Sequence, residues 1–311
     1  GNFEKSPQTL PSYRYESTGC VTAGDYDGDG DQDLFVGMRL VPFLYGVPAN
    51  GYILENDGQG QFKNVTNTIA PELERIGLLT DATWADVDGD KDLDLAIIGD
   101  WLPLTFFIND NGIFQKQELP QTNGFWNSLA AADVNADGLV DFVAGNHGLN
   151  SRFRAQADEP ITMHVNDFDG NGTAEQIISV YNGGESYPLA LRHDLVMQMP
   201  SLKKKYLKYE EYKNQTVQDI FTPEQLEKSV VQRVFTTESS VFINEGNGNF
   251  RQQPLPLPAQ LAPVYGLEIN DFNADGHLDI LLGGNFHRAK PEVGIYDASY
   301  GLLLRGDGSG Q

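Results

Sequence analysis

The chain has 311 residues, of which 40% are hydrophobic and 21% charged, so it has enough apolar side chains for a core and is not expected to be disordered. Its 21 Lys and Arg residues against 44 Asp and Glu residues give a formal net charge of -23. Such a charge repels phosphate backbones and anionic lipids, and no apolar run reaches the roughly 18 to 20 residues of a membrane helix, so neither nucleic acid nor direct membrane insertion is expected.

The two ends of the chain resemble parts of a repeat. Gly1-Asn2-Phe3 matches the start of a strand, and residues 306–311 match the turn that precedes such a strand. We therefore expect a fragment of a longer protein, whose two ends complement each other to close a ring. The tripeptide Arg305-Gly306-Asp307 falls within this turn and is interpreted as part of it, not as an integrin-recognition motif.

Cys20 is the only cysteine, so an intrachain disulfide is excluded. It lies in an apolar strand pattern, where a free thiol behaves as a small hydrophobic side chain. We expect Cys20 to be an inert core residue.

One aspartate-rich pattern occurs five times along the chain: Asp, any residue, Asp or Asn, any residue, Asp or Asn, three residues, then Asp or Glu. It starts at Asp25, Asp86, Asp133, Asp167 and Asp271. At ordinary residue frequencies a single match is expected in only about one or two per hundred chains of this length. The pattern is therefore an internal repeat and not a by-product of acidity.

The context of these loops repeats as well. Small or apolar residues precede a loop and an apolar run follows it, which predicts strand, loop and strand. A later strand then enters an Asn/Asp/Gly turn and a Gly-x-Phe strand start, at residues 53–62 and 241–250. Each repeat is thus predicted to be a four-stranded antiparallel sheet, and the whole chain, residues 1–311, a single all-β domain: a β-propeller of about five to seven blades.

The spacing of the loops is uneven. The interval from Asp133 to Asp167 is too short for a complete extra blade, so either the third blade is reduced or the Asp167 loop lies at a non-equivalent place in the ring. The interval from Asp167 to Asp271 is the longest and is predicted to contain an insertion.

A short helical insertion is expected at about residues 199–229. Leu202, Tyr206 and Tyr209 follow helical spacing, and Thr222-Pro223-Glu224-Gln225 supplies an N-cap, a proline at the first helical position and a capping-box partner. Two short helices are predicted there. The insertion also carries a basic patch, either a solvated face against the acidic propeller or a partner-binding cap: Lys203, Lys204, Lys205, Lys208 and Lys213.

The repeated loops have the donors of a calcium site. In the first loop, side chains of the first, third, fifth and ninth residues and the carbonyl of the seventh would bind the ion; hard oxygen donors at this density favour Ca²⁺ over Mg²⁺. We expect up to about five Ca²⁺ ions. The predicted ligands are Asp25, Asp27, Asp29, Asp31 and Asp33; Asp86, Asp88, Asp90, Asp92 and Asp94; Asp133, Asn135, Asp137, Leu139 and Asp141; Asp167, Asp169, Asn171, Thr173 and Glu175; and Asp271, Asn273, Asp275, His277 and Asp279.

Two details refine this reading. The sixth residue of the loop is glycine in four loops but Lys91 in the second, where a left-handed backbone would cost about 1 to 2 kcal/mol. An EF-hand needs a Glu at the twelfth position and flanking helices, but this position is apolar in every loop, so an EF-hand is excluded. The residues concerned are Val36, Ile97, Ala144, Ile178 and Leu282.

These loops and their flanking strands resemble the FG-GAP and VCBS repeats of integrin-α-like propellers, and the chain is similar to bacterial relatives of cartilage acidic protein. The resemblance covers nearly the whole chain apart from the helical insertion. It implies Ca²⁺ in the loops, a secreted, periplasmic or cell-surface location, and roles in adhesion or carbohydrate handling.

A ligand site is expected on the face opposite the calcium loops, where the segments after each second strand converge around the propeller axis. Trp101 is predicted to offer a stacking platform for a sugar, with burial in the core as the alternative, and the remaining side chains are expected either to donate to a ligand or to pack within loops. These candidates are Arg39, Asp100, Trp101, Asn146, His147, Arg152, Asn285, His287 and Arg288.

No HExxH helix, phosphate-binding glycine loop or G-x-S-x-G elbow occurs, so no catalytic residue is predicted. The leading hypothesis is an extracytoplasmic calcium-binding module for a glycan or protein. Two alternatives stay open, a polysaccharide lyase or hydrolase and a purely architectural domain of a larger surface protein.

Overall fold

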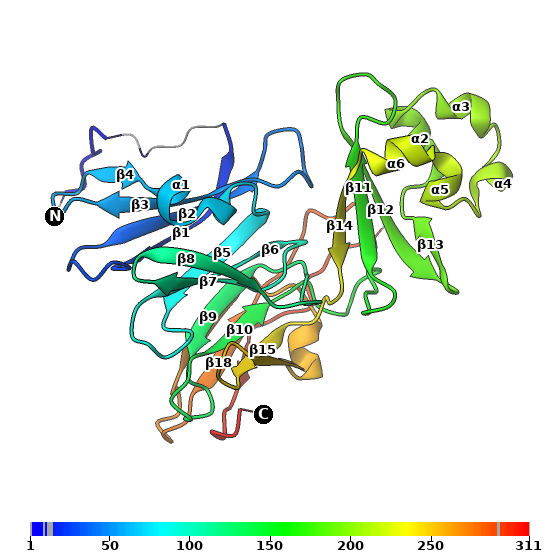
Figure 1. The fold of residues 1–311 in the computed structure, drawn as a ribbon. Helices are drawn as coiled ribbons and strands as arrows, with labels where there is room; N and C mark the ends of the chain where they lie inside the picture. Colours follow the sequence, from blue (N-terminus) through cyan, green and yellow to red (C-terminus); the bar gives the residue numbers. More distant parts are fainter. Residues whose placement is uncertain (1, 9, 11–14, 291–292, 311) are drawn as a thin grey trace.

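The computed structural model describes residues 2–8, 10, 15–290 and 293–310, and within them the chain is mostly β. Four antiparallel sheets follow one another in a stack (Figure 1). The first sheet contains β1 (Ser17–Gly24), β2 (Asp33–Leu40), β3 (Gly51–Asn56) and β4 (Phe62–Asn64), and the second β5 (Leu78–Ala85), β6 (Asp94–Asp100), β7 (Thr105–Asp110) and β8 (Ile113–Glu118). The third contains β9 (Ser128–Ala132), β10 (Asp141–Gly145), β15 (Ser240–Asn244) and β16 (Phe250–Pro254), and the last β17 (Gly266–Asn270), β18 (Asp279–Gly283) and β19 (Leu302–Leu304).

Neighbouring sheets of the stack pack face to face through apolar side chains. Phe35 and Ile53 of the first sheet pack with residues of the second, and Phe106 of the second packs with Phe142 and Phe242 of the third. A further cluster joins the third sheet to the last. Because both faces of an inner sheet are covered, all of β6 is buried, as expected for a propeller blade. The expected fold class, four-stranded antiparallel blades with a short helical insertion, is confirmed.

A fifth sheet explains the uneven loop spacing. The inserted sheet contains β11 (Ile161–Asn166), β12 (Glu175–Asn182), β13 (Glu185–Pro188) and β14 (Val230–Val234), in the order β13-β12-β11-β14. The inserted sheet lies between β10 and β15 in the sequence. The chain therefore leaves the third sheet after β10, forms the inserted sheet, and returns to the third sheet as β15. At the point of departure the Gly148 N–H donates a 2.7 Å hydrogen bond to the Thr237 carbonyl. The Asp167 loop therefore lies at a non-equivalent place, one of the two expected explanations.

The helical part is more extended than the sequence indicated. Short helices α2 (Arg192–Gln198), α3 (Leu202–Lys205), α4 (Tyr209–Tyr212), α5 (Val217–Ile220) and α6 (Pro223–Glu227) lie between β13 and β14, so the prediction of two helices within 199–229 is wrong in number and starting point. The predicted Thr222 cap is present, with its hydroxyl accepting from the Gln225 N–H. The helices pack on the inserted sheet, where Phe221 stacks on Phe168 with ring centroids 4.0 Å apart.

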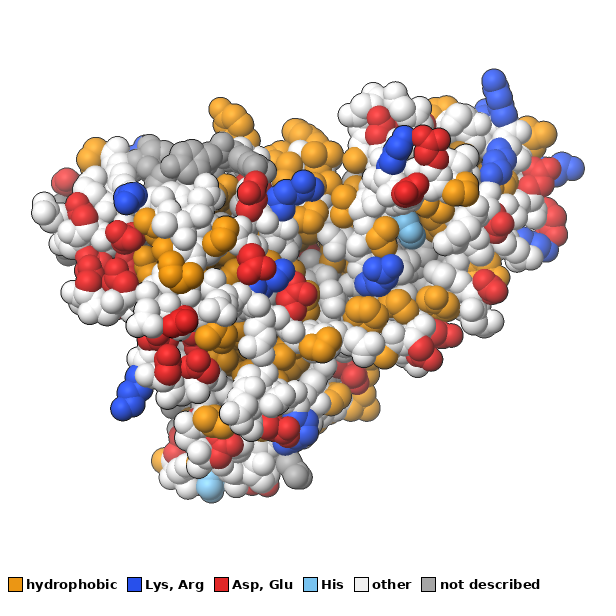
Figure 2. Space-filling model, viewed as in Figure 1, with side chains coloured by type: hydrophobic (Ala, Val, Ile, Leu, Met, Phe, Trp, Pro, Cys, Tyr) orange, Lys and Arg blue, Asp and Glu red, His pale blue; other side chains and the backbone are white. Residues whose placement is uncertain are grey.

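Three other short helical segments in the described residues are α1 (Thr66–Ile69), η1 (Pro71–Leu73) and η2 (Leu257–Gln260). None of the helices in the described residues is both long enough and apolar enough to cross a membrane. Figure 2 shows acidic side chains gathered over the stacked sheets, while Lys and Arg side chains project at the helical end.

The expected closure by the two ends is not seen within the described residues. Gly1 and Gln311 lie outside them; Asn2 and Phe3 belong to no strand, and Phe3 is fully exposed. The N-terminal segment lies beside the first sheet, at the other end of the stack from the last sheet (Figure 1).

Candidate functional site

All five aspartate-rich loops fold alike. In each, the backbone N–H of the sixth residue donates to Oδ2 of the first aspartate, which closes the loop around its carboxylates. The five hydrogen bonds are Gly30 to Asp25 (3.1 Å), Lys91 to Asp86 (3.2 Å), Gly138 to Asp133 (2.8 Å), Gly172 to Asp167 (2.8 Å) and Gly276 to Asp271 (2.9 Å).

The sixth residue has a left-handed backbone in each loop. Its φ is 95° at Gly30, 89° at Gly138, 87° at Gly172 and 90° at Gly276, and Lys91 adopts the same conformation with a φ of 82°. Because a side chain at positive φ crowds the backbone, the second loop carries a local strain that the other four avoid.

The ninth residue is buried at the base of its loop. Asp94 is fully buried; its Oδ2 accepts from the Val87 N–H at 2.7 Å, and its Oδ1 accepts from the Asn109 N–H at 2.7 Å. Asp141 accepts from Val134 and Asn244 in the same way. Burial raises the pKa of the Asp94 carboxyl to about 6, against the opposing effect of its backbone hydrogen bonds. This carboxylate thus links the acidic loop to the end of the third strand.

Several loop oxygens are buried without a hydrogen-bond partner: Oδ1 of Asp25, Oδ2 of Asp33, and Oδ1 of Asp31 and Asp92. Burial raises the pKa of Asp33 to about 6, which shows that its negative charge is poorly compensated by the protein alone. A cation bound among these oxygens would supply the missing partner, and the donor set therefore fits a metal ion.

Three acidic clusters have carboxylate oxygens that all lie within 4.8 Å of one another and could hold a metal ion. They are Asp25, Asp27 and Asp29; Asp86, Asp88 and Asp90; and Asp167, Asp169 and Glu175. The third, fourth and fifth loops each have an Asn in place of one carboxylate: Asn135, Asn171 and Asn273. The Asn135 amide donates to Asp137 at 2.8 Å, as Asn273 does to Asp275, so in these two loops a carboxylate of the fifth residue already has a hydrogen bond. The lower negative charge makes all three loops weaker candidates than the first two. The seventh-position carbonyls remain predicted ligands, and the His277 side chain is exposed, as expected for a residue whose side chain does not bind the ion.

The opposite face begins where each second strand ends, since β1 and β2 pair antiparallel with Ser17 across from Leu40. Arg39 lies there with its side chain 46% exposed and forms a 2.9 Å ion pair with the buried Asp100. Tyr45 donates a 3.4 Å hydrogen bond to the same Asp100 oxygen. Arg39 is therefore already paired within the protein.

The prediction that Trp101 offers an open stacking platform is wrong. Trp101 is 2% exposed, its Nε1 donates to the Tyr45 hydroxyl at 3.0 Å, and its ring meets Phe125 edge-on. It packs against Ile161 and Met163 of the inserted sheet, so the insertion covers the ring. The alternative of burial in the core is correct.

Asn146 and His147 are also held by the fold. Asn146 is fully buried, and its side-chain oxygen accepts from the Phe125 N–H at 3.0 Å. His147 lies among aromatic rings, with Tyr296 at 5.0 Å between centroids, and burial lowers its pKa to about 4. Asn285 braces its own loop through hydrogen bonds with the Ser299 backbone. We therefore withdraw Trp101 and Asn146 as ligand contacts.

The remaining candidates are exposed, and one of them, Arg152, lines a cleft. Arg152, His287 and Arg288 are exposed, and Arg152 stands over the Phe153 ring at 5.9 Å. A cleft of about 460 Å³ is lined by Asn150, Ser151, Arg152, Arg154, Val293 and Tyr296. Tyr45 and Tyr296 were not predicted from the sequence, since no local pattern indicates that a tyrosine contacts a residue of another loop.

Comparison with known proteins identifies the repeat. A family described as FG-GAP-like repeat matches residues 43–97 and 86–144, which span the second sheet and parts of the first and third. No match was found among curated proteins. Residues 43–144 therefore consist of FG-GAP-like repeats.

Proposed function

We propose that this chain, with its FG-GAP-like repeats at residues 43–144, is a calcium-stabilised extracytoplasmic module that binds a carboxylated or hydroxyl-rich glycan. The observation that carries the calcium part is the set of buried, unpartnered oxygens of Asp25, Asp31 and Asp33 in one loop. A bare cluster of this kind repels itself, and a hard divalent cation relieves the repulsion.

Calcium is the favoured ion because the side-chain donors are carboxylate and amide oxygens, and the left-handed sixth residue already folds the loop around them. Ca²⁺ accepts six to eight oxygens in flexible geometry, whereas Mg²⁺ demands a strict octahedron. When bound, the ion would neutralise the charge at the tips of the sheets and so hold β1 to β2 and β5 to β6.

The cleft beside Arg152 supports the glycan part of the proposal. Its lining combines an arginine, an aromatic ring at Tyr296 and the small polar groups of Asn150 and Ser151, which is the mixture that binds sugar hydroxyls and carboxylates. The Arg154 guanidinium donates to the carbonyls of Leu149, Ser151 and Phe153 and so braces the cleft wall. Arg152 is the side chain best placed to meet a ligand.

An extracytoplasmic location follows from the expected affinity. Loops of extracellular modules bind Ca²⁺ at about 10⁻⁴ to 10⁻³ M, far above cytosolic levels of the free ion, so such loops fill only outside the cytosol.

The metal part is tested by thermal unfolding with Ca²⁺ or with excess EDTA, together with isothermal titration of the stripped protein. Ca²⁺ is expected to raise the melting temperature, because a ligand of the native state adds RT ln(1 + [L]/Kd) to stability. Asp27→Asn is expected to weaken binding, and Ser6→Ala is a matched surface control. An unchanged melting curve and no titration heat would refute it.

The ligand part is tested by screening immobilised glycans and extracellular matrix proteins with the calcium-loaded protein. We expect glycan binding that Arg152→Ala lowers about tenfold or more and that Arg288→Ala, outside the cleft lining, leaves nearly unchanged. Binding to a protein alone would refute the glycan assignment, as would a glycan signal that Arg152→Ala does not change.

A further inference from the structure

A second cleft adjoins the one that Arg152 lines. Its volume is about 660 Å³, within the range of about 300 to 1,000 Å³ that is typical of ligand pockets. Its walls come mainly from residues 120–121, 154–157 and 235–238 and from β16. Because Arg154 lines both openings, the two clefts are neighbours.

Both clefts are built where the inserted sheet leaves the third sheet. At this point the Gly148 N–H donates a 2.7 Å hydrogen bond to the Thr237 carbonyl. Thr237 and Leu149 line the second cleft, and Asn150 lines the Arg152 cleft. The two openings therefore depend on the insertion, and a four-stranded blade without it would have neither.

The second opening, which we call the Glu238 cleft, contains a free carboxylate. The Glu238 backbone is fixed, since its N–H donates to the Thr236 hydroxyl at 3.1 Å and its carbonyl accepts from the Ser240 hydroxyl at 3.2 Å. The half-buried Glu238 side chain forms neither a hydrogen bond nor an ion pair with any residue that the structure describes. A fixed acceptor without a partner is preorganised for a ligand.

Amide side chains share this cleft with the carboxylate. They are Gln121, Gln156 and Gln252, and the Gln252 amide nitrogen donates to the Ser240 hydroxyl at 3.1 Å. Amides both donate and accept hydrogen bonds, as sugar hydroxyls do. Phe235 adds an apolar wall against which the C–H face of a sugar ring can pack. The Glu238 cleft thus suits a hydroxyl-rich ligand.

The two clefts differ in charge. Arg152 is exposed at the first, so an acidic group is attracted there. At the second, the Arg154 guanidinium is bound to the carbonyls of the cleft wall and forms no ion pair with Glu238 among the described residues. A ligand carboxylate in the second cleft would therefore face the uncompensated charge of Glu238.

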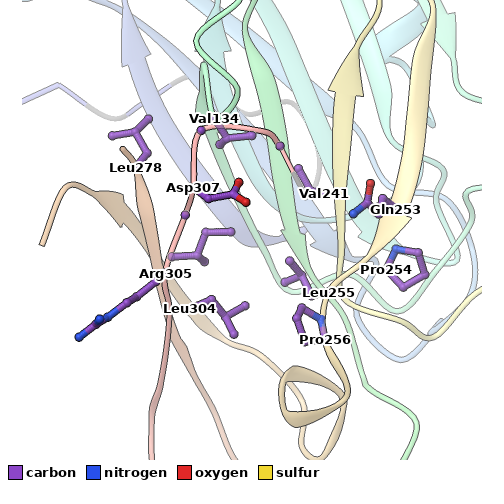
Figure 3. A pocket seen from close by; sticks show the side chains of 14 residues that line it. Val134, Val241, Gln253, Pro254, Leu255, Pro256, Leu278, Leu304, Arg305 and Asp307 are labelled. Atoms are coloured by element: carbon purple, nitrogen blue, oxygen red, sulfur yellow. The ribbon is translucent and has the colours of Figure 1, made fainter. Parts of the chain in front are cut away.

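The cavity between the third and last sheets has a different character (Figure 3). It measures about 240 Å³ and is lined mainly by apolar side chains, among them Val241, Leu255 and Leu304. Sugar hydroxyls would find few polar partners there, so we place no part of a glycan in it.

We propose that one glycan chain occupies both clefts, with an acidic sugar residue at Arg152 and an uncharged, hydroxyl-bearing residue at Glu238. The Glu238 carboxylate accepts hydrogen bonds from the hydroxyls and repels a second acidic residue, so it determines specificity. This inference rests on the proposed function, because it takes the Arg152 cleft as a glycan site. The ligand class is a polysaccharide in which acidic and uncharged residues adjoin, and not a homopolymer of uronic acid.

The test compares two β-1,4-linked tetrasaccharides that differ only in charge: tetraglucuronate, and a chain that alternates glucuronate with glucose. Isothermal titration of the calcium-loaded full chain, in salt that screens charges beyond about 8 Å, measures both dissociation constants. We expect the alternating chain to bind about tenfold or more tightly than tetraglucuronate. Methyl glucuronoside, which fills only the Arg152 cleft, should bind more weakly than the alternating chain.

Glu238→Gln should remove this preference by tightening the binding of tetraglucuronate about tenfold, while methyl glucuronoside binds as before. The change keeps the shape of the side chain, so the melting temperature should not fall. Asp158→Asn is the matched control, because Asp158 is exposed on the same segment outside the cleft lining and loses the same charge. It should leave the preference unchanged.

The outcomes separate this inference from the proposed function. Equal binding of the two tetrasaccharides, or a preference that Glu238→Gln does not change, overturns the Glu238 cleft even if Arg152→Ala still weakens binding. A preference that Asp158→Asn removes equally reports the overall charge of the chain and also overturns it. Binding that Arg152→Ala leaves unchanged would instead refute the proposed function, and this inference with it.

Discussion

The backbone N–H of Asn109 donates a 2.7 Å hydrogen bond to Oδ1 of Asp94, which links the end of β7 to the last acidic residue of the second aspartate-rich loop. The other Asp94 oxygen accepts from Val87 at the start of the loop. One buried carboxylate thus fixes both the loop and the neighbouring strand, so its structural role is distinct from that of the exposed loop carboxylates.

Asp94→Asn should therefore destabilise the protein even without Ca²⁺. An amide nitrogen in place of one oxygen would face a backbone N–H, and an unsatisfied buried donor costs about 1 to 3 kcal/mol. Denaturant unfolding in excess EDTA measures this loss. Asp88→Asn is the control: Asp88 is exposed in the same loop, and its substitution should lower stability only when Ca²⁺ is present. Equal effects of both variants in EDTA would contradict the distinction.

Lys91→Gly should stabilise the second loop. Lys91 has a φ of 82°, which costs a non-glycine residue about 1 to 2 kcal/mol, and part of the gain is lost because glycine is more flexible in the unfolded chain. We expect a net gain of about 0.5 to 1 kcal/mol in the free energy of unfolding, measured in saturating Ca²⁺.

Gly138→Lys is the matched reverse change. A Cβ at Gly138 meets no atom within 4 Å, so only the backbone conformation should oppose it, and a similar loss is expected. A Gly138→Lys variant as stable as the original protein would show that the backbone conformation carries little strain.

The sheets and the folds of the acidic loops could be predicted because their signals are local. The acidic pattern lies within nine residues, and the alternation of buried and half-buried residues in β11 and β12 follows the two-residue period of a strand. The position of the Asp167 loop in the fold could not be predicted from its sequence, because its pattern is the same as that of the other loops. Only the pairing of β10 with β15 shows that its sheet is an insertion.

The ligand face was harder to predict, since burial depends on segments far apart in the chain. Trp101 follows a strand directly, which made an exposed loop position reasonable. The residues that cover it, Ile161 and Met163, belong to the inserted sheet, and the sequence around Trp101 does not predict that contact. The pairing of Arg39 with Asp100 likewise joins two different sheets.

Trp101→Ala should lower stability and leave the acidic loops intact. Removing a buried Trp costs about 3 to 5 kcal/mol, here by opening a cavity against Phe125 and Ile161. Trp101→Phe should cost less, since it keeps most of the packing and loses the hydrogen bond to Tyr45. Urea unfolding and calcium titration check both. Normal stability of Trp101→Ala would show that the ring is not part of the core.

His147 should make stability depend on pH between about 4 and 6.5. Burial lowers its folded-state pKa from 6.5 to about 4, so the unfolded chain binds more protons in this range. Stability contributed by neutral His147 is therefore present above pH 6.5 and lost as pH falls towards 4. With about 1.4 kcal/mol per pKa unit, the loss is at most about 3 kcal/mol.

His147→Gln isolates this effect, because the metal loops also respond to acid. The difference in unfolding free energy between the original protein and His147→Gln should shrink as pH falls from 7 to 4.5, in constant Ca²⁺. A difference that stays constant over this range would mean that His147 titrates with an ordinary pKa.

The last prediction concerns the helices of the insertion. Phe221 and Ile220 share a core with Phe168 of the Asp167 loop and Ile177 of β12, so a bridged deletion of residues 199–229 should expose that core. The insertion is joined to the third sheet by a stem closed by the Gly148 to Thr237 hydrogen bond, and the stacked sheets have separate cores. Hydrogen exchange should therefore show lost protection in β11 and β12, with β5 and β6 still protected. Lost protection in β5 and β6 as well would show that the helices support the whole stack, and unchanged protection in β11 would show that the inserted sheet does not depend on them.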